Sequence, residues 1–215
     1  MNNLRFALDK AFYYSWDEMK FFLLSVVISG FILAFRKWGL VDFNPDTALG
    51  DFLLYTLIFL IIFFVFVSAQ KFIASNLGYR CKFKLWEFSP FIGLVITFIS
   101  YGFIPFLYLG NVELERIEHL RLGHFRQHVN IKDLMVIGVA GPLAVMLFTL
   151  IILMPLYFSL KLELLRNAII VSTLIIFFTS LPLPNTNGIN VLLFSKTGWV
   201  VYFLFGLLLL VLIIP

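Results

Sequence analysis

FFTSLPLPNTNGINVLLFS, residues 177–195, interrupts two long apolar runs near the end of the chain. Pro182 and Pro184 cannot donate backbone hydrogen bonds, and each disfavours a helical conformation of the residue before it. The Asn-Thr-Asn-Gly that follows, residues 185–188, is typical of a turn. Backbone groups freed beside a membrane need polar partners. The break is therefore either a plain loop at a membrane face or a polar notch, centred on residues 185–190, that holds something.

The composition of the whole chain predicts whether it lies in water or in a membrane. Of the 215 residues, 61% are hydrophobic and 13% are charged, against about 25% charged in an average soluble domain. So much apolar surface predicts an integral membrane protein. The formal net charge of +4 is typical of basic residues on cytoplasmic loops, and we expect no nucleic-acid partner. The single cysteine, Cys81, excludes an intrachain disulfide and a zinc cage made of thiolates.

Uncharged intervals predict the membrane spans, because a crossing helix needs roughly 17–25 apolar residues. The intervals are 21–35, 52–70, 88–112, 134–160, 167–195 and 197–215. Residues 4–19 mix aromatic and charged side chains, which is typical of an interfacial helix. We therefore divide the chain into residues 1–50, with the interfacial helix and the first transmembrane helix, a membrane core over 51–195, and a C-terminal transmembrane helix over 196–215.

The interval 88–112 decides the topology. If all six intervals cross, the two sides carry eight and seven Lys and Arg, whereas they carry eleven and four if 88–112 returns to the side it left, with Lys71 counted on neither side. Cytoplasmic sides are rich in Lys and Arg, which favours the second arrangement in the cell membrane, with a cytoplasmic N-terminus. A plain sixth crossing is the alternative. The expected fold class is an all-α polytopic membrane protein with five to six transmembrane helices and a re-entrant or hairpin segment near 80–112.

Residues 80–85 alternate between basic and other side chains, with Cys81, Phe83 and Leu85 on one side. This alternation predicts a short edge strand or hairpin at the inner face. Lys71 is the one charge within reach of the notch. It is expected to snorkel to the inner face, and pairing with carbonyl groups near Pro184 is the alternative.

A second motif, VAGPLAVMLFTLIIL at residues 139–153, opens the fourth apolar interval. Gly141 and Ala144 are small and let another helix approach closely. Pro142 is expected in the first turns of the helix, where its missing N–H costs little.

Together the two motifs resemble the site-2 protease family of intramembrane zinc metalloproteases. That family carries Ala-Gly-Pro-Leu-Ala-Asn at one helix start and a later Pro-x-Pro-x-x-Asp-Gly pattern, which residues 140–144 and 182–188 match in order. The resemblance covers about residues 52–195. It implies a zinc site built from a His-Glu-x-x-His motif and the Asp of the Asp-Gly pair, and a strand that receives an unwound substrate by edge pairing.

The family's active-site positions are substituted in this chain. With the register taken from Ala74 and Gly78, these positions fall on Phe66, Val67, Gln70, Val145 and Asn187. Residues 52–70 contain no His or Glu, so a shifted register restores nothing. Catalytic zinc needs about three N, O or S ligands and a water, and the protease needs a carboxylate base. We therefore expect no cofactor and no protease activity.

Three functions remain open. The first is an inactive site-2-protease-like protein that binds a transmembrane partner or forms part of a membrane complex. The second is an active zinc metalloprotease with non-standard ligands, such as His119, His124 and His128, whose plainer interpretation is an amphipathic helix on the membrane surface. The third is a lipid or small-molecule carrier. Membrane lipid is an expected partner as well. The candidate pocket or partner-binding residues are Lys71, Pro182, Pro184, Asn185, Asn187 and Asn190.

Overall fold

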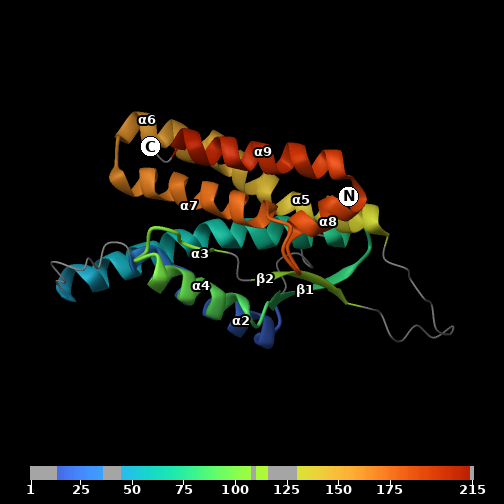
Figure 1. Cartoon of the computed structure of the whole chain (residues 1–215), viewed down its shortest axis with the longest axis horizontal. Coiled ribbons are helices and arrows are strands. Elements are labelled where there is room, and N and C mark those ends of the chain that lie inside the picture. Colours follow the sequence, from blue (N-terminus) through green and yellow to red (C-terminus); the bar gives the residue numbers. More distant parts are fainter. Residues whose placement is uncertain (1–13, 36–44, 108–109, 116–129, 214–215) are drawn as a thin grey trace.

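The structure is a computed structural model that describes residues 14–35, 45–107, 110–115 and 130–213 (Figure 1). In chain order its elements are α2 (Trp16–Phe35), α3 (Pro45–Asn76), β1 (Arg80–Leu85), α4 (Ser89–Ile99), β2 (Gly110–Glu115), α5 (Ile131–Phe148), the π-helical turn η2 (Thr149–Leu153), α6 (Met154–Leu160), α7 (Glu163–Ser180), α8 (Asn187–Phe194) and α9 (Lys196–Ile213). Residues 4–13 of the expected interfacial helix and the three histidines lie outside the described residues, and residues 16–19 of that expected helix belong to α2 instead.

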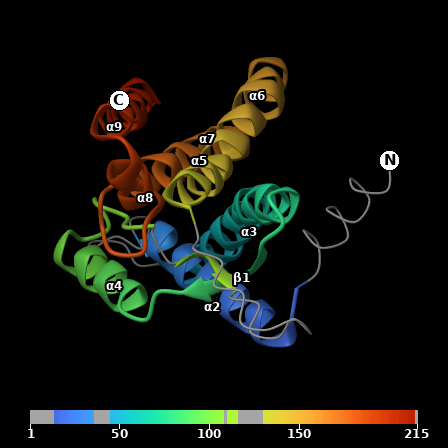
Figure 2. The ribbon, with the colours of Figure 1, turned by 90° about the vertical axis from the view of Figure 1, so that its right-hand side faces the viewer.

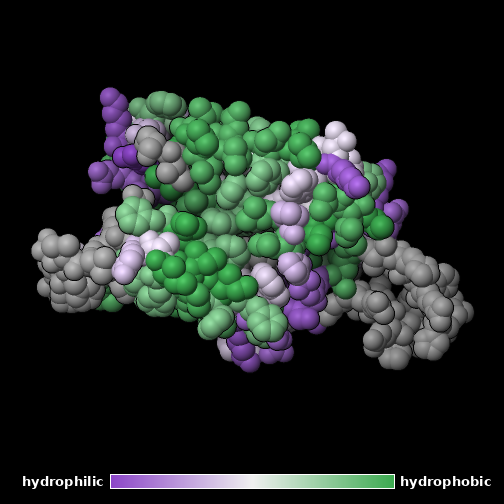
Figure 3. Space-filling view, viewed as in Figure 1, coloured by the Kyte–Doolittle hydropathy of each residue, from purple (hydrophilic) through white to green (hydrophobic). Residues whose placement is uncertain are grey.

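Five helical segments within the described ranges are long and apolar enough to cross a membrane. They are Trp16–Phe35, Thr47–Asn76, Ile131–Leu160, Glu163–Ser180 and Lys196–Ile213. Apolar side chains cover most of the face shown in Figure 3, and polar side chains gather in a few patches along its rim. Monomeric soluble proteins rarely expose apolar patches of this extent. The chain is therefore an all-α polytopic membrane protein, as its composition predicts.

The helix α3 lies in the middle of the bundle. It packs against α2 on one side and α5 on the other, and α7 packs against α9 (Figures 1 and 2). Phe59, Ile62 and Phe66 are fully buried along α3. Residues of α3 that face α5 are therefore shielded from the surroundings of the bundle.

The strands β1 and β2 form an antiparallel hairpin, with Arg80 opposite Glu115 and Leu85 opposite Gly110. Phe83 is buried while Lys82 and Lys84 are exposed, which confirms the predicted alternation. The segment between the strands leaves and returns at the same end of the molecule, which we call the hairpin end (Figure 1). This is the geometry that a re-entrant segment needs, and its depth in a membrane stays a prediction.

The first transmembrane helix begins earlier than the uncharged interval suggests. α2 starts at Trp16, so that Asp17 and Glu18 lie in its first turn. The Ser15 hydroxyl accepts the backbone N–H of Glu18 at 3.3 Å, and the Glu18 carboxylate accepts the backbone N–H of Ser15 at 3.3 Å. This reciprocal capping, together with the attraction of acidic side chains to a helix N-terminus, explains the earlier start.

The expected position of Pro142 in the first turns of its helix is wrong. α5 begins at Ile131, after Asn130, whose side chain accepts the backbone N–H of Lys132 at 3.0 Å. Pro142 consequently lies inside the helix. The sequence interval misplaced it because the cap and the charged first turn precede the apolar run. Helices in a membrane tolerate such a proline when neighbouring groups satisfy the freed backbone.

Candidate functional site

The Thr186 hydroxyl group organises the break between α7 and α8. Its oxygen lies 2.6 Å from the Leu181 carbonyl oxygen and 2.7 Å from that of Leu183, and the hydroxyl proton serves these acceptors. The same oxygen accepts the backbone N–H of Ile189 at 3.4 Å, which caps α8. Asn185 completes the turn in the left-handed conformation, with a φ of 63°. The polar partner that this break requires is therefore supplied within it.

Gly188 lets α8 begin directly beside the end of α7. A Cβ atom at this position would collide with the backbone carbonyl oxygens of Ser180 and Leu181. Pro182 and Pro184, in contrast, are exposed at the surface of the break. The turn thus leaves its prolines outside and places Asn187, which is fully buried, towards the interior.

Small residues on one face of α5 bring three helices together. A Cβ atom at Gly141 would lie 2.8 Å from the Phe66 ring and 3.0 Å from Cγ of Gln70, both in α3. A Cβ atom at Gly138 would lie 3.5 Å from Cβ of Asn187 in α8. Residues three apart are neighbours on a helix face. The face of α5 that contacts α3 therefore also contacts the helix that follows the break.

The five positions that the family resemblance predicts for an active site are all buried. Phe66, Val67, Gln70, Val145 and Asn187 are each 0% or 1% exposed. Val145 is four residues after Gly141 and shares its face of α5. Through Gly141 and Gly138, one face of α5 connects Phe66 and Gln70 with Asn187, although Phe66 and Asn187 are 121 positions apart in the sequence. The register inferred from Ala74 and Gly78 places every one of these positions at helix interfaces.

Gln70 and Asn187 are the polar members of this set. Neither side-chain amide has a hydrogen-bond partner among the described residues. Leaving a buried polar group unpaired costs roughly 1–3 kcal/mol. Close packing alone therefore does not account for two carboxamides at this depth.

The residues do not fit a catalytic zinc ion. Phe66, Val67 and Val145 offer only hydrocarbon, and carboxamides are weak zinc ligands beside imidazole and carboxylate. In the part of the chain that the structure describes, no three His, Cys, Asp or Glu side chains gather into a possible metal site. The chemistry available at this interface is neutral hydrogen bonding.

A groove of about 540 Å³ separates the break from the hairpin. We call it the hairpin groove. Its lining includes Trp86, Asn111 and Val112 from the hairpin side, with Asn185 and Asn190 from the break. Two of the predicted notch residues therefore face a real groove, whereas Asn187 faces α5 instead.

Some backbone groups of β2 point away from β1 and towards this groove. The Phe83 backbone N–H donates to Glu18 and so points away from β2. Phe83 and Val112 are therefore a non-hydrogen-bonded pair, in which the backbone groups of Val112 also point outward. The Val112 N–H donates to the side-chain oxygen of its neighbour Asn111 at 2.8 Å. Leu114 lies two residues further on and has the same orientation.

The expectation that Lys71 snorkels to the inner face is wrong. Its side chain is 1% exposed, and Nζ lies 2.7 Å from Oε1 of Glu18. The Tyr14 ring centroid lies 3.8 Å from the same Nζ. The ammonium group stays inside because a carboxylate and an aromatic face compensate its charge there. Pairing with carbonyls near Pro184, the alternative, does not describe this contact either.

The pKa of Tyr14, whose ring faces Lys71, is also shifted by burial. Its hydroxyl group lies 3.4 Å from Oγ of Ser68. Burial, which disfavours the charged phenolate, raises the pKa of Tyr14 to about 12, although the hydrogen bond with Ser68 lowers it. Tyr14 therefore remains a neutral, packing side chain at physiological pH.

Sequence reasoning missed Glu18 and Thr186 as organising residues. The Ser-x-x-Glu spacing at 15–18 is a signal of a helix cap, but it gives no indication that the carboxylate also reaches α3 and β1. Thr186 stands among typical turn residues and looks interchangeable with them. Their roles depend on which distant groups the fold brings within hydrogen-bond distance.

The comparisons with known proteins add no relative: the chain matches no protein-family model, no curated protein and no solved structure.

Proposed function

We propose that this chain is a catalytically inactive site-2-protease-like membrane protein that binds a transmembrane partner, with an extended segment of that partner in the hairpin groove. The observation that carries the proposal is the meeting of the two family-like motifs. One face of the helix with Gly141 and Pro142 contacts Gln70 through Gly141 and Asn187 through Gly138, and a shared active-site framework would require both contacts. The motifs are 38 residues apart in the sequence, from Ala144 to Pro182, and nothing local dictates that they meet.

The substitutions at the gathered positions support inactivity. A metalloprotease of this kind needs imidazole ligands and a carboxylate base, and the corresponding residues here are Phe66, Val67, Gln70 and Asn187. A zinc site with ligands from the histidine loop would concern residues outside the described ranges. A protein that keeps the framework without the reactive groups is suited to binding.

The hairpin groove supports binding of an extended peptide segment. A strand edge binds peptide through backbone hydrogen bonds, and carboxamides such as those of Asn185 and Asn190 can both donate to and accept from a peptide backbone. Such a segment would be a part of a transmembrane partner that is unwound beside the membrane face. The lipid or small-molecule carrier is the second candidate, because the same groove is its pocket.

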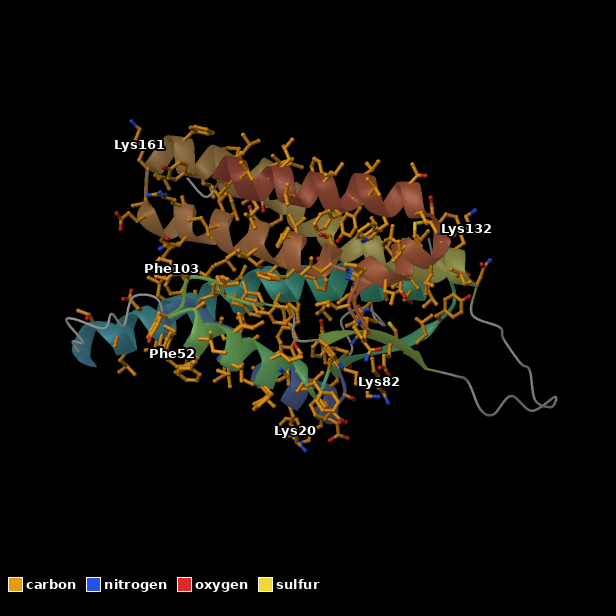
Figure 4. All side chains as sticks on the ribbon, in the orientation of Figure 1. Lys20, Phe52, Lys82, Phe103, Lys132 and Lys161 are labelled. Atoms are coloured by element: carbon orange, nitrogen blue, oxygen red, sulfur yellow. The ribbon has the colours of Figure 1, made fainter. Side chains whose placement is uncertain are left out.

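The orientation that we propose places the hairpin end in the cytoplasm of a cell with this protein in its plasma membrane. Lys82 and Lys132 lie towards the hairpin end, and Lys161 lies at the opposite end (Figure 4). An excess of Lys and Arg is typical of the cytoplasmic side. The N-terminal segment, which leads into the start of α2, would then also be cytoplasmic.

A gain-of-function variant tests the framework. The quadruple variant Phe66→His, Val67→Glu, Gln70→His and Asn187→Asp should bind one zinc ion per purified chain, while the wild-type chain binds none, by metal analysis after dialysis. As a control, Leu60→His with Phe64→His places two histidines on the exposed side of α3 and should bind no stoichiometric zinc. A folded quadruple variant without zinc would show that the register is wrong.

A photo-reactive side chain at Asn190 tests the groove. In native membranes it should cross-link to one single-span membrane protein, identified by mass spectrometry of the joined peptides. Leu114→Pro should abolish this adduct, because it removes an outward N–H and leaves the bonds between β1 and β2 intact, whereas Leu114→Ala should retain it. Adducts to lipid alone would favour the carrier, and adducts unaffected by Leu114→Pro would contradict edge pairing.

A further inference from the structure

A buried ion pair joins three elements at the hairpin end. Nζ of Lys71 in α3 lies 2.7 Å from Oε1 of Glu18 in α2, and the two side chains are 1% and 2% exposed. The same carboxylate oxygen accepts the backbone N–H of Phe83 in β1 at 2.8 Å. One carboxylate group therefore connects two transmembrane helices to the hairpin.

Further contacts of this pair are polar and aromatic. Oε2 of Glu18 accepts the backbone N–H of Ser15 at 3.3 Å, and the Tyr14 ring faces the ammonium group of Lys71. The hairpin and the segment before α2 therefore add to the compensation that the two charges give each other. The carboxylate also closes the outer edge of β1 at Phe83.

The aromatic contacts of Phe83 hold the hairpin independently of charge. Its ring centroid lies 5.4 Å from that of Phe63 in α3 and 6.1 Å from that of Phe22 in α2. Such contacts favour association of the hairpin with the helices but do not penalise small displacements strongly. A buried charge that loses its partner, in contrast, is strongly unfavourable and draws in water.

We propose that the Glu18–Lys71 pair is a latch that seats the hairpin on α2 and α3, so that loss of either charge unseats β1 while the rest of the bundle stays folded. α7 and α9 pack against each other on the other side of α3 from α2 (Figures 1 and 2). The latch concerns the position of the hairpin whatever occupies the groove, so it does not depend on the proposed function.

Cys81 provides a natural probe of the latch. It is the sole cysteine of the chain, lies two residues before Phe83 on the same side of β1, and is half-buried. Glu18→Gln and Lys71→Met should each raise the rate of maleimide modification of Cys81 at least about tenfold, because each removes one partner of the buried ion pair. The double variant should return to within about threefold of the wild-type rate, since the carboxamide introduced at position 18 keeps an oxygen for the Phe83 N–H and no charge remains.

Lys20→Met is the matched control, because Lys20 forms an exposed ion pair with Asp17 at 3.3 Å and its removal should leave the rate unchanged. Hydrogen exchange measured on the same samples separates a local latch from general stabilisation. Faster exchange in 80–85 with unchanged protection in α7 supports the latch. Unchanged Cys81 modification in the single variants, a double variant as reactive as either single one, or parallel loss of protection in α7 would each overturn it.

Discussion

Gly141 determines how closely α5 can approach α3. Gly141→Ala would place a methyl group 2.8 Å from the Phe66 ring, and overpacking of this kind costs about 1–3 kcal/mol. We expect the free energy of unfolding, measured by titration of mixed micelles with a denaturing detergent, to fall by that amount. Phe66→Leu in the same chain should recover part of the loss, because it removes the ring that the methyl group meets.

Gly50→Ala is the control for this substitution. Gly50 lies in α3, the helix that Gly141 of α5 contacts, but a Cβ atom at Gly50 would meet nothing within 4 Å. Alanine is a better helix former than glycine by up to about 1 kcal/mol, so this variant should be at least as stable as the wild type. A Gly141→Ala variant that behaves like Gly50→Ala would contradict the close contact between α5 and α3.

At the scale of elements, the contact between α5 and α8 defines the candidate site. A Cβ atom at Gly138 would lie 3.5 Å from Cβ of Asn187, which is within the range of about 3.5–4.5 Å found in disulfides. In a chain with Cys81→Ala, Gly138→Cys and Asn187→Cys should therefore form a disulfide on mild oxidation. Mass spectrometry of the linked peptides would detect it.

The pair Gly50→Cys with Asn187→Cys serves as the control, because Gly50 lies near the start of α3 and Asn187 at the hairpin end (Figure 1). This pair should remain reduced in the monomer. Failure of the cysteines at 138 and 187 to react in a folded chain would mean that α8 does not return to α5. The proposed framework would then lose its main support.

At the scale of the whole molecule, the hairpin predicts the topology. Because β1 and β2 pair, Glu87 and Glu113 lie near the same end, and α4, with 11 residues, spans only about 17 Å. The substitution Cys81→Ala first removes the native cysteine. In that background, the cysteines introduced by Glu87→Cys and by Glu113→Cys should react with a membrane-impermeant maleimide from the same side. Lys161→Cys should react from the opposite side.

Inside-out and right-side-out vesicles measured in parallel distinguish the two sides. Reaction of the cysteines at 87 and 113 from opposite sides would establish a sixth crossing instead of a re-entrant segment. Reaction of the cysteine at 161 from the same side as 113 would contradict the crossing by α5 to α6. The assignment of the hairpin end to the cytoplasm is tested by the same experiment.

Several features of this protein follow from its sequence alone. Composition, periodicity and backbone preferences, which act over a few residues, predict the membrane environment and most of the spans. They also predict the strand at 80–85 and the turn at 185–188. The break is predicted as a candidate notch, and Asn185 and Asn190 do line a groove. The predicted position of Pro142 is wrong because helix length depends on a cap, Asn130, outside the apolar run.

Only the tertiary structure decided which distant groups meet. Glu18 and Lys71 are 53 residues apart, and each by itself resembles an interfacial charge. Asn187 and Gly138, and likewise Phe83 and Glu18, meet through helix packing and strand pairing that no local pattern specifies. Local preferences determine where elements begin and end, whereas the energy of a buried charge or carboxamide depends on all elements that surround it.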